Sequence, residues 1–245
     1  MSHSVGRHGP GDVRFFDRIA PLYDVAMPPV RPADLRAGFR LADRSIRRVL
    51  DAAGGTGRAA RAVRVATDGT WADGHTRAGP SRTDAETDSG SSSGTADVTV
   101  LDVSAGMLGR AAADGLAAVR GDARRPPIRP GAVDAVVIAD ALHHVPDWPA
   151  ALTALSETVA PGGVVVVREF DPTTLRGWAL ARLEHLAGMD SVFATPEDIR
   201  EQLRAAGLRA YTLQPGFGYT VVGVVPRGRG DERHEPTHGG ASTET

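Results

Sequence analysis

Residues 48–58 read Arg-Val-Leu-Asp-Ala-Ala-Gly-Gly-Thr-Gly-Arg, and this stretch decides the fold. The Val-Leu pair predicts the end of a buried strand, and Asp51 places an acid at its carboxyl end. The glycines that follow predict a turn that only small side chains allow. Apolar residues then recur at helical spacing from Ala59 to Ala66. A strand, a glycine turn and a helix in this order predict a ligand above the helix N-terminus.

This turn resembles the nucleotide loop of class I S-adenosylmethionine-dependent methyltransferases, whose usual pattern is Asp-x-Gly-x-Gly-x-Gly. Ala53 stands at the first glycine of that pattern, and Gly55 and Gly57 match the other two. The form Leu-Asp-x-Ala-Gly-Gly-Thr-Gly looks most like the ubiquinone/menaquinone C-methyltransferase branch. The resemblance implies that the cofactor is S-adenosylmethionine and that it is bound here by Asp51, Ala53, Gly54, Gly55 and Gly57. The dinucleotide fingerprint cannot be fitted to this stretch. The alternative is a glycine-rich turn without a ligand.

Length and composition favour a single α/β domain. The 245 residues can bury a sizeable core. The net charge of −2 argues against a nucleic-acid partner, which would need a basic excess. The absence of Cys excludes disulfides and thiolate metal sites, and we expect no metal. No run approaches about 18 apolar residues. We therefore expect a cytoplasmic protein without stable membrane insertion. Nothing in the sequence indicates the oligomeric state.

Residues 15–24 form a second motif, Phe-Phe-Asp-Arg-Ile-Ala-Pro-Leu-Tyr-Asp. It looks like the Phe-Asp-x-Ile-Ala-x-x-Tyr-Asp opening of many quinone and related methyltransferases, in which a helical arm folds over the cofactor. The resemblance implies that Tyr23 lies near the carboxylate end of the cofactor. The alternative is an ordinary amphipathic helix with Phe15, Ile19 and Leu22 facing inward.

Residues 98–102 predict the second strand, with Asp102 at its carboxyl end. An acid there can accept both ribose hydroxyls of an adenosyl group, and a solvated strand-end Asp is the alternative. Asp102 follows Gly57 by 45 residues, where about 20 is usual. The polar stretch 67–97 explains the excess, because its linker-like composition cannot bury enough apolar surface to order itself.

Positions beyond the second strand also follow the family pattern. Val103 and Met107 are placed to contact the adenine. In the family an acid after the third strand takes the adenine amino group. The resemblance implies this role for Asp122, with Ala123 beside it, and a turn Asp is the alternative.

Residues 133–139 predict a buried strand that ends at Ala139. Ala139 is a further expected cofactor contact. The chain then continues into the sequence Leu-His-His-Val. This ending resembles the fourth-strand end of many small-molecule methyltransferases, below the sulfonium. The closest quinone enzymes usually carry Arg-Asn at the two histidine positions. Either His143 or His144 can take a proton from a phenol or quinol acceptor, since imidazole titrates closest to neutral pH. The alternative is a histidine that bonds a backbone carbonyl and shapes the loop.

The remaining pattern predicts helices and a final hairpin. A helix is expected over 32–43, another over 149–159 that Pro161-Gly162-Gly163 ends, and another from Thr195 to Gly207. Residues 172–188 predict an amphipathic helix that either roofs the acceptor pocket or packs in the core. Its large apolar residues are Leu175, Trp178, Leu183 and Leu186. Residues 208–213 and 219–225 predict an antiparallel pair.

We therefore expect an α/β fold: a doubly wound, Rossmann-like, mostly parallel sheet with a C-terminal antiparallel hairpin, in three layers. The expected organisation is a disordered N-terminus (1–11), one methyltransferase domain (12–226) with a disordered insertion (67–97), and a disordered tail (227–245).

The function predicted is methyl transfer from S-adenosylmethionine to a small, largely apolar molecule such as a quinol or a related lipid. The alternative is a regulatory or degenerate module that keeps the cofactor site without catalysis. A nicotinamide dehydrogenase is disfavoured, because the chain lacks the glycine fingerprint and has no Lys for a Tyr-x-x-x-Lys pair.

Overall fold

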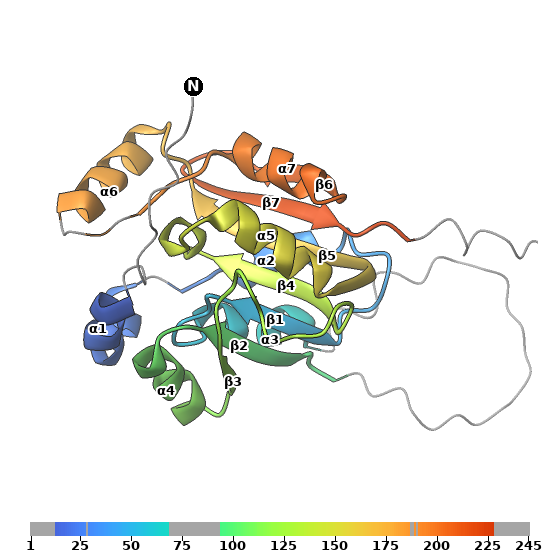
Figure 1. Cartoon of the computed structure of the whole chain (residues 1–245), viewed down its shortest axis with the longest axis horizontal. Helices are drawn as coiled ribbons and strands as arrows, with labels where there is room; N and C mark the ends of the chain where they lie inside the picture. Colours follow the sequence, from blue (N-terminus) through green and yellow to red (C-terminus); the bar gives the residue numbers. More distant parts are fainter. Residues whose placement is uncertain (1–12, 28, 69–93, 187–188, 190, 228–245) are drawn as a thin grey trace, which may run out of the picture.

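The fifteen elements of the fold run through residues 13–27, 29–68, 94–186, 189 and 191–227, which the computed structural model describes (Figure 1). In chain order they are α1 (Val13–Ala26), α2 (Pro32–Phe39), β1 (Arg48–Ala52), α3 (Arg58–Thr67), β2 (Asp97–Asp102), α4 (Ala105–Ala113), β3 (Ala117–Arg120), β4 (Val133–Ala139), the 3₁₀ turn η2 (Leu142–His144), α5 (Trp148–Glu157), β5 (Val159–Phe170), α6 (Leu175–Leu186), α7 (Pro196–Ala205), β6 (Arg209–Gln214) and β7 (Gly218–Val224).

The segments expected to be disordered lie largely outside the described residues. The bounds expected for the insertion, 67–97, are too wide at both ends, because Thr67 is the last residue of α3 and Asp97 is the first residue of β2. Arg227, expected in the tail, donates a hydrogen bond to the backbone oxygen of Asp43.

The strands form one sheet in the order β3-β2-β1-β4-β5-β7-β6. β1 to β5 pair in parallel, whereas β7 runs antiparallel to both β5 and β6. The predicted sheet and its antiparallel hairpin are confirmed. The strand order reverses between β1 and β4. In such sheets the crevice at the carboxyl ends beside this reversal is where ligands bind.

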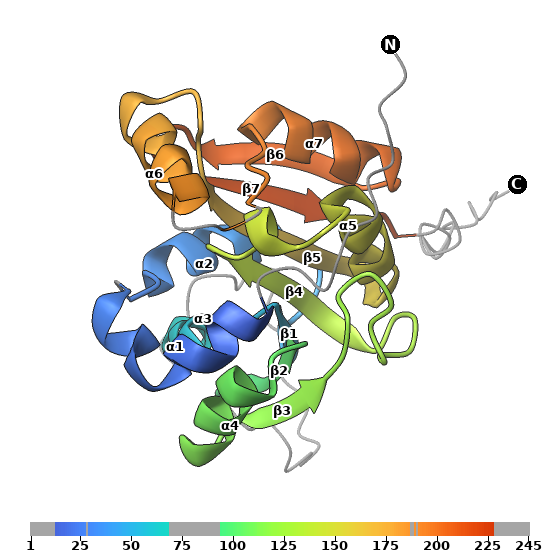
Figure 2. The same ribbon diagram turned by 60° about the vertical axis from the view of Figure 1, so that its left-hand side comes forward.

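Helices cover both faces of the sheet, which gives the three layers (Figures 1 and 2). Successive strand residues point to opposite faces, so Val136 and Val165 pack on one side and Val137 and Val166 on the other. The first side packs against α5 and α7, and the second against α2, α3 and α4. The helices of the first side contribute the buried residues Leu152, Leu155, Ile199 and Leu203. Those of the second side contribute Leu35, Phe39, Val63 and Leu108.

One expectation about local structure is wrong, and so is the inward orientation of Phe15 and Leu22 in the alternative interpretation of α1. The Pro161-Gly162-Gly163 segment lies inside β5 and does not end α5, which stops at Glu157. Phe15 and Leu22 are exposed on α1, at 37% and 70%.

The predicted roof helix corresponds to α6, but its large apolar side chains are exposed and do not join the core. Trp178 is 59% exposed and Leu175 is 82% exposed, whereas Gly177 and Glu184 are the buried residues of the helix. The end of the predicted helix, at residues 187–188, lies outside the described part of the chain.

Candidate functional site

A cavity of about 430 Å³ opens at the carboxyl ends of β1, β2 and β4, beside the reversal of strand order. Its walls come from α1, the glycine turn and the segments after β2, β3 and β4. The predicted residues that line it are Tyr23, Ala53, Gly55, Asp102, Val103, Met107, Asp122, Ala123 and His144. The predicted residues that do not are Asp51, Gly54, Gly57, Ala139 and His143.

Asp51 lies beneath the glycine turn and acts on its shape. Its Oδ2 accepts the backbone N–H of Ala60 at 2.8 Å, at the first turn of α3. A Cβ at position 54 would lie 2.5 Å from the Asp51 carboxyl carbon, so only glycine fits there. Gly57 needs its glycine as well, because its φ is +82°. Burial raises the pKa of Asp51 to about 7. The predicted cofactor role of these three residues is therefore indirect, through the backbone that they shape.

Asp102 forms the part of the cavity wall beside the glycine turn. Its Oδ2 accepts the N–H of Gly55 at 2.9 Å, and its Oδ1 accepts the N–H of Ser104 at 2.8 Å. Burial raises the pKa of its carboxyl, while these backbone N–H donors oppose the rise. Each carboxylate oxygen has a second lone pair. Both oxygens can therefore still accept a hydroxyl of a ligand in the cavity.

Asp122 is paired within its own turn. Arg124 donates to both of its carboxylate oxygens, with an ion pair of 2.6 Å, and this contact lowers the pKa of Asp122. Both residues line the cavity. Because guanidinium donors occupy the carboxylate, an adenine amino group at Asp122 would share it with Arg124.

Helix α1 closes the cavity on the side of α4 and is attached by both motif aspartates (Figure 2). Asp17 Oδ1 accepts the hydroxyl of Ser104 at 2.6 Å, at the N-terminus of α4. Asp24 accepts the hydroxyl of Thr56 in the glycine turn and pairs with Arg61 of α3 at 2.9 Å. Tyr23 faces the cavity between these anchors, and burial raises the pKa of its phenol. The motif thus forms a cover over the cavity.

Asp140 lines the cavity but was not predicted from the sequence. It is 4% exposed, has a φ of +53°, and forms ion pairs with Arg58 and Arg168. The rule that selected Asp51 and Asp102, an acid at the carboxyl end of a parallel strand, also selects Asp140 after β4. Ala141 and Arg124 line the cavity too and carried no sequence signal for this role, whereas Phe16 belongs to the motif of residues 15–24.

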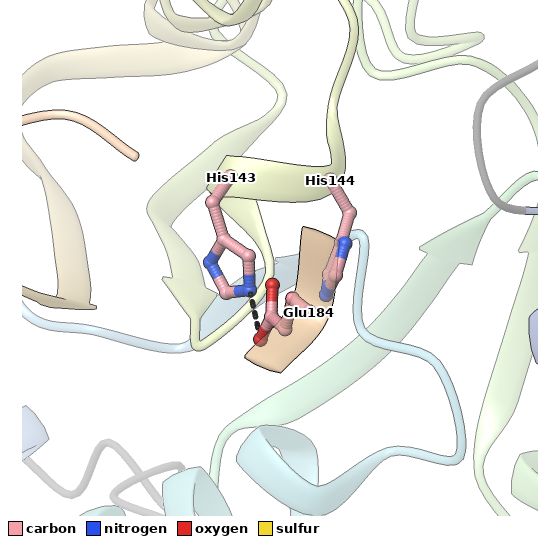
Figure 3. Close-up of side chains that lie close together, drawn as sticks. All are labelled: His143, His144 and Glu184. Atoms are coloured by element: carbon pink, nitrogen blue, oxygen red, sulfur yellow. Dashed lines mark ion pairs between the residues drawn. The ribbon is translucent and has the colours of Figure 1, made fainter. Parts of the chain in front are cut away.

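His143 and His144 form η2 after β4 and point towards Glu184 of α6 (Figure 3). His143 Nδ1 lies 2.7 Å from Glu169 Oε2, and its Nε2 lies 3.7 Å from Glu184 Oε1. Burial alone would lower the pKa of His143, but Glu169 and then Glu184 raise it above its usual value. Positive charge is therefore stabilised at this point.

His144 lines the cavity, whereas His143 does not. Burial and the neighbouring His143 lower the pKa of His144 to about 2, so its imidazole is neutral at neutral pH. Its Nδ1 lies 3.2 Å from Ser191 Oγ. Such an imidazole is a weak proton acceptor, and the general-base role expected for either histidine stays a prediction.

Residues 27–213 match the family model of the methyltransferase domain. The chain belongs to this methyltransferase family. The resemblance to class I S-adenosylmethionine-dependent methyltransferases is thereby confirmed.

The demethylmenaquinone methyltransferase of Mycobacterium tuberculosis (strain H37Rv) is 33% identical over 192 residues, which are 76% of this chain and 70% of that enzyme. Matches to such enzymes span from 37% to 70% of their length.

Two solved structures share the fold. A possible histamine N-methyltransferase from Thermotoga maritima has a TM-score of 0.62 at 15% identity, over 86% of this chain and 98% of that one. An O-methyltransferase of neocarzinostatin biosynthesis, in complex with S-adenosyl-L-homocysteine and 1,4-dihydroxy-2-naphthoic acid, has a TM-score of 0.56 at 19% identity, over 87% and 57%. Among the described residues, no helix has the length and apolar character needed to cross a membrane.

Proposed function

We propose that this chain binds S-adenosylmethionine in the cavity and transfers its methyl group to a small, largely apolar acceptor of the quinol or hydroxylated aromatic class. The observation that carries the proposal is the convergence of Asp102, the glycine turn and the motif helix α1 on one cavity at the switch point. Family membership supports the reaction. The names of the relatives support the acceptor class, since they include demethylmenaquinone methyltransferases.

In this proposal the two ends of the cofactor contact different walls of the cavity. The ribose hydroxyls bind Asp102, and the adenine lies against Val103 and Met107 near Asp122. The methionine part lies over Gly55, beneath Tyr23. Helix α3 directs its N-terminus to this region, and the positive end of a helix dipole favours anionic groups.

The acceptor binds at the end of the cavity that Phe16 and His144 form. The rings of these two residues meet edge to face, with centroids 4.8 Å apart. Aromatic walls of this kind hold a planar ring and exclude water. In the reaction the bond between sulfur and methyl breaks, and its electron pair stays on sulfur. The acceptor atom forms the new bond to the methyl, and the acceptor proton passes to water. The protein supplies alignment and electrostatics, because the cofactor brings its own electrophile.

The test is incubation of the full chain with methyl-labelled S-adenosylmethionine and separate panels of dihydroxynaphthoates and quinols, peptides, and RNA. Label in the aromatic panel alone is the expected result, with the Asp102→Ala variant as background. Label only in peptide or RNA would show that the acceptor class is wrong. Calorimetric binding of the cofactor without turnover on any panel would favour the regulatory module instead.

A further inference from the structure

We propose that His143, His144 and Glu184 form a binding site for one divalent transition-metal ion of the Zn²⁺ type, at the wall of the cavity (Figure 3). Each residue offers one ligand atom, and these atoms all lie within 4.8 Å of one another. Imidazole nitrogen and carboxylate oxygen are donors that Zn²⁺ and its first-row neighbours prefer. Mg²⁺ and Ca²⁺ prefer oxygen donors alone, so the two imidazoles disfavour them.

The spacing of the ligand atoms suits a shared ion. Two ligands at about 2.1 Å from the ion of a tetrahedral site lie about 3.4 Å apart. The 3.7 Å between His143 Nε2 and Glu184 Oε1 is close to this spacing. The 4.8 Å bound on the whole set exceeds it by about 1.4 Å. Side-chain rotations of Glu184 and His144 close that gap when the ion binds.

The carboxylates around the site supply the charge that a dication needs. Glu184 is 9% exposed and its Oε2 has no hydrogen-bond partner, although a buried carboxylate oxygen is costly to leave unpaired. Glu169, 3% exposed, adds a second negative charge next to His143. A bound dication would satisfy Glu184 and balance both charges.

The contacts behind the ligands orient them as in known metal sites. Glu169 holds His143 Nδ1, which directs Nε2 towards Glu184, and Glu169 Oε1 is fixed by the N–H groups of Ala141 and Leu142 at 2.9 and 2.6 Å. A carboxylate behind a ligating imidazole is the usual second partner at metal sites. Phe193 stacks on His143 with centroids 4.4 Å apart and shields this side from water.

The role of the ion rests on the proposed function, whereas its binding does not. His144 lines the cavity, so an ion bound to it lies at the acceptor end. Three protein ligands leave a position in a tetrahedral site. An acceptor hydroxyl that takes this position is held as an oxyanion, its proton having passed to water.

The test is Zn²⁺ titration of the full, metal-free chain in competition with a chromophoric chelator, without cofactor or acceptor. The chain has eight histidines, so the variants decide which site is measured. We expect one tight site, weakened at least about 10-fold in Glu184→Gln and His144→Gln. His185→Gln is the matched control, because His185 is on the same helix, is exposed and bonds Ala181 O. It should bind Zn²⁺ as the wild type does.

Equal affinity in the wild type and Glu184→Gln, or no tight site at all, would overturn the proposal. X-ray absorption of the Zn²⁺-loaded wild type gives a second decision that needs no variant. A coordination shell of two imidazoles and one carboxylate supports the proposed site, and a coordination shell with fewer than two imidazoles contradicts it. A negative result in either measurement contradicts the metal site alone, because cofactor binding and methyl transfer are tested by the separate experiments above.

Discussion

Asp17 of α1 is bonded to Ser104 at the N-terminus of α4, with 2.6 Å between Oδ1 and Oγ. The same Oδ1 accepts the N–H of Gly106 at 2.9 Å, and Ser104 Oγ accepts the N–H of Met107 at 3.1 Å. One carboxylate therefore joins the cover helix to a helix terminus whose N–H groups need partners. These hydrogen bonds lower the pKa of Asp17. The anchor is therefore present at neutral and mildly acidic pH and is lost only as pH falls through the lowered value.

We predict that Asp17→Asn weakens S-adenosylmethionine binding about 2- to 10-fold, the effect of one net hydrogen bond. The cover would open more often, while the sheet and its two cores keep their contacts. Calorimetry on the purified chain measures the affinity, and thermal melting checks the fold. Asp43→Asn is the control, since Asp43 is exposed and its carboxylate pairs with Arg209. Equal affinities for Asp17→Asn and wild type would mean that α1 closes without this anchor.

Asp102→Ala should weaken cofactor binding about 10- to 100-fold, because it removes charge-assisted hydrogen bonds of roughly 1.5–3 kcal/mol each before water compensates. Part of the loss comes from the turn, since Asp102 also holds Gly55. Asp97→Ala is the control: Asp97 is exposed at the other end of the same strand. Calorimetry with S-adenosylhomocysteine measures both variants. An Asp102→Ala variant that binds as tightly as Asp97→Ala would exclude the ribose role.

Asp51 should make the free protein less stable as pH rises towards neutrality. Burial raises its folded-state pKa from 3.8 to about 7, so between these values the folded chain holds a proton that the unfolded chain has released. Stability then falls with rising pH, by at most about 4 kcal/mol between about pH 4 and pH 7, and this effect is constant above that range. Asp51→Asn keeps an acceptor for the N–H of Ala60 and removes the titration. Urea unfolding at several pH values should show that the variant gains stability over the wild type as pH rises from 4 to 7. A difference that does not change with pH would contradict the prediction.

The sequence predicted those parts of the fold and site that local patterns encode. A continuous apolar run predicted β4, and the cap at Thr195 predicted α7, whose capping box is present. The strand-end rule located Asp102 from its position after an apolar run. These features depend on neighbours in the chain, so periodicity and capping preferences suffice to find them.

The errors concern contacts between distant segments. Trp178 and Leu175 suggested a buried face, but which side of α6 meets the protein is decided by the packing of Glu184 against η2, 40 residues earlier in the chain. The ion pairs of Asp140 with Arg58 and Arg168 likewise join the residue after β4 to the start of α3 and to β5, which only the sheet order brings together. No spacing in the sequence encodes such a juxtaposition.

The last prediction concerns Ala53, which takes the place of the first glycine in the turn and has a φ of +52°. A left-handed conformation costs an L-residue about 1–2 kcal/mol, whereas glycine adopts it freely but loses about 0.5–1 kcal/mol through its larger entropy of unfolding. Ala53→Gly should therefore raise the free energy of unfolding by up to about 1.5 kcal/mol. Ala52→Gly, one residue earlier in β1 and fully buried, is the matched control. It should lower stability, because it removes a packed methyl group from an extended residue. Urea unfolding of both variants decides the matter: if Ala53→Gly is destabilised as much as Ala52→Gly, residue 53 does not hold a left-handed conformation in solution.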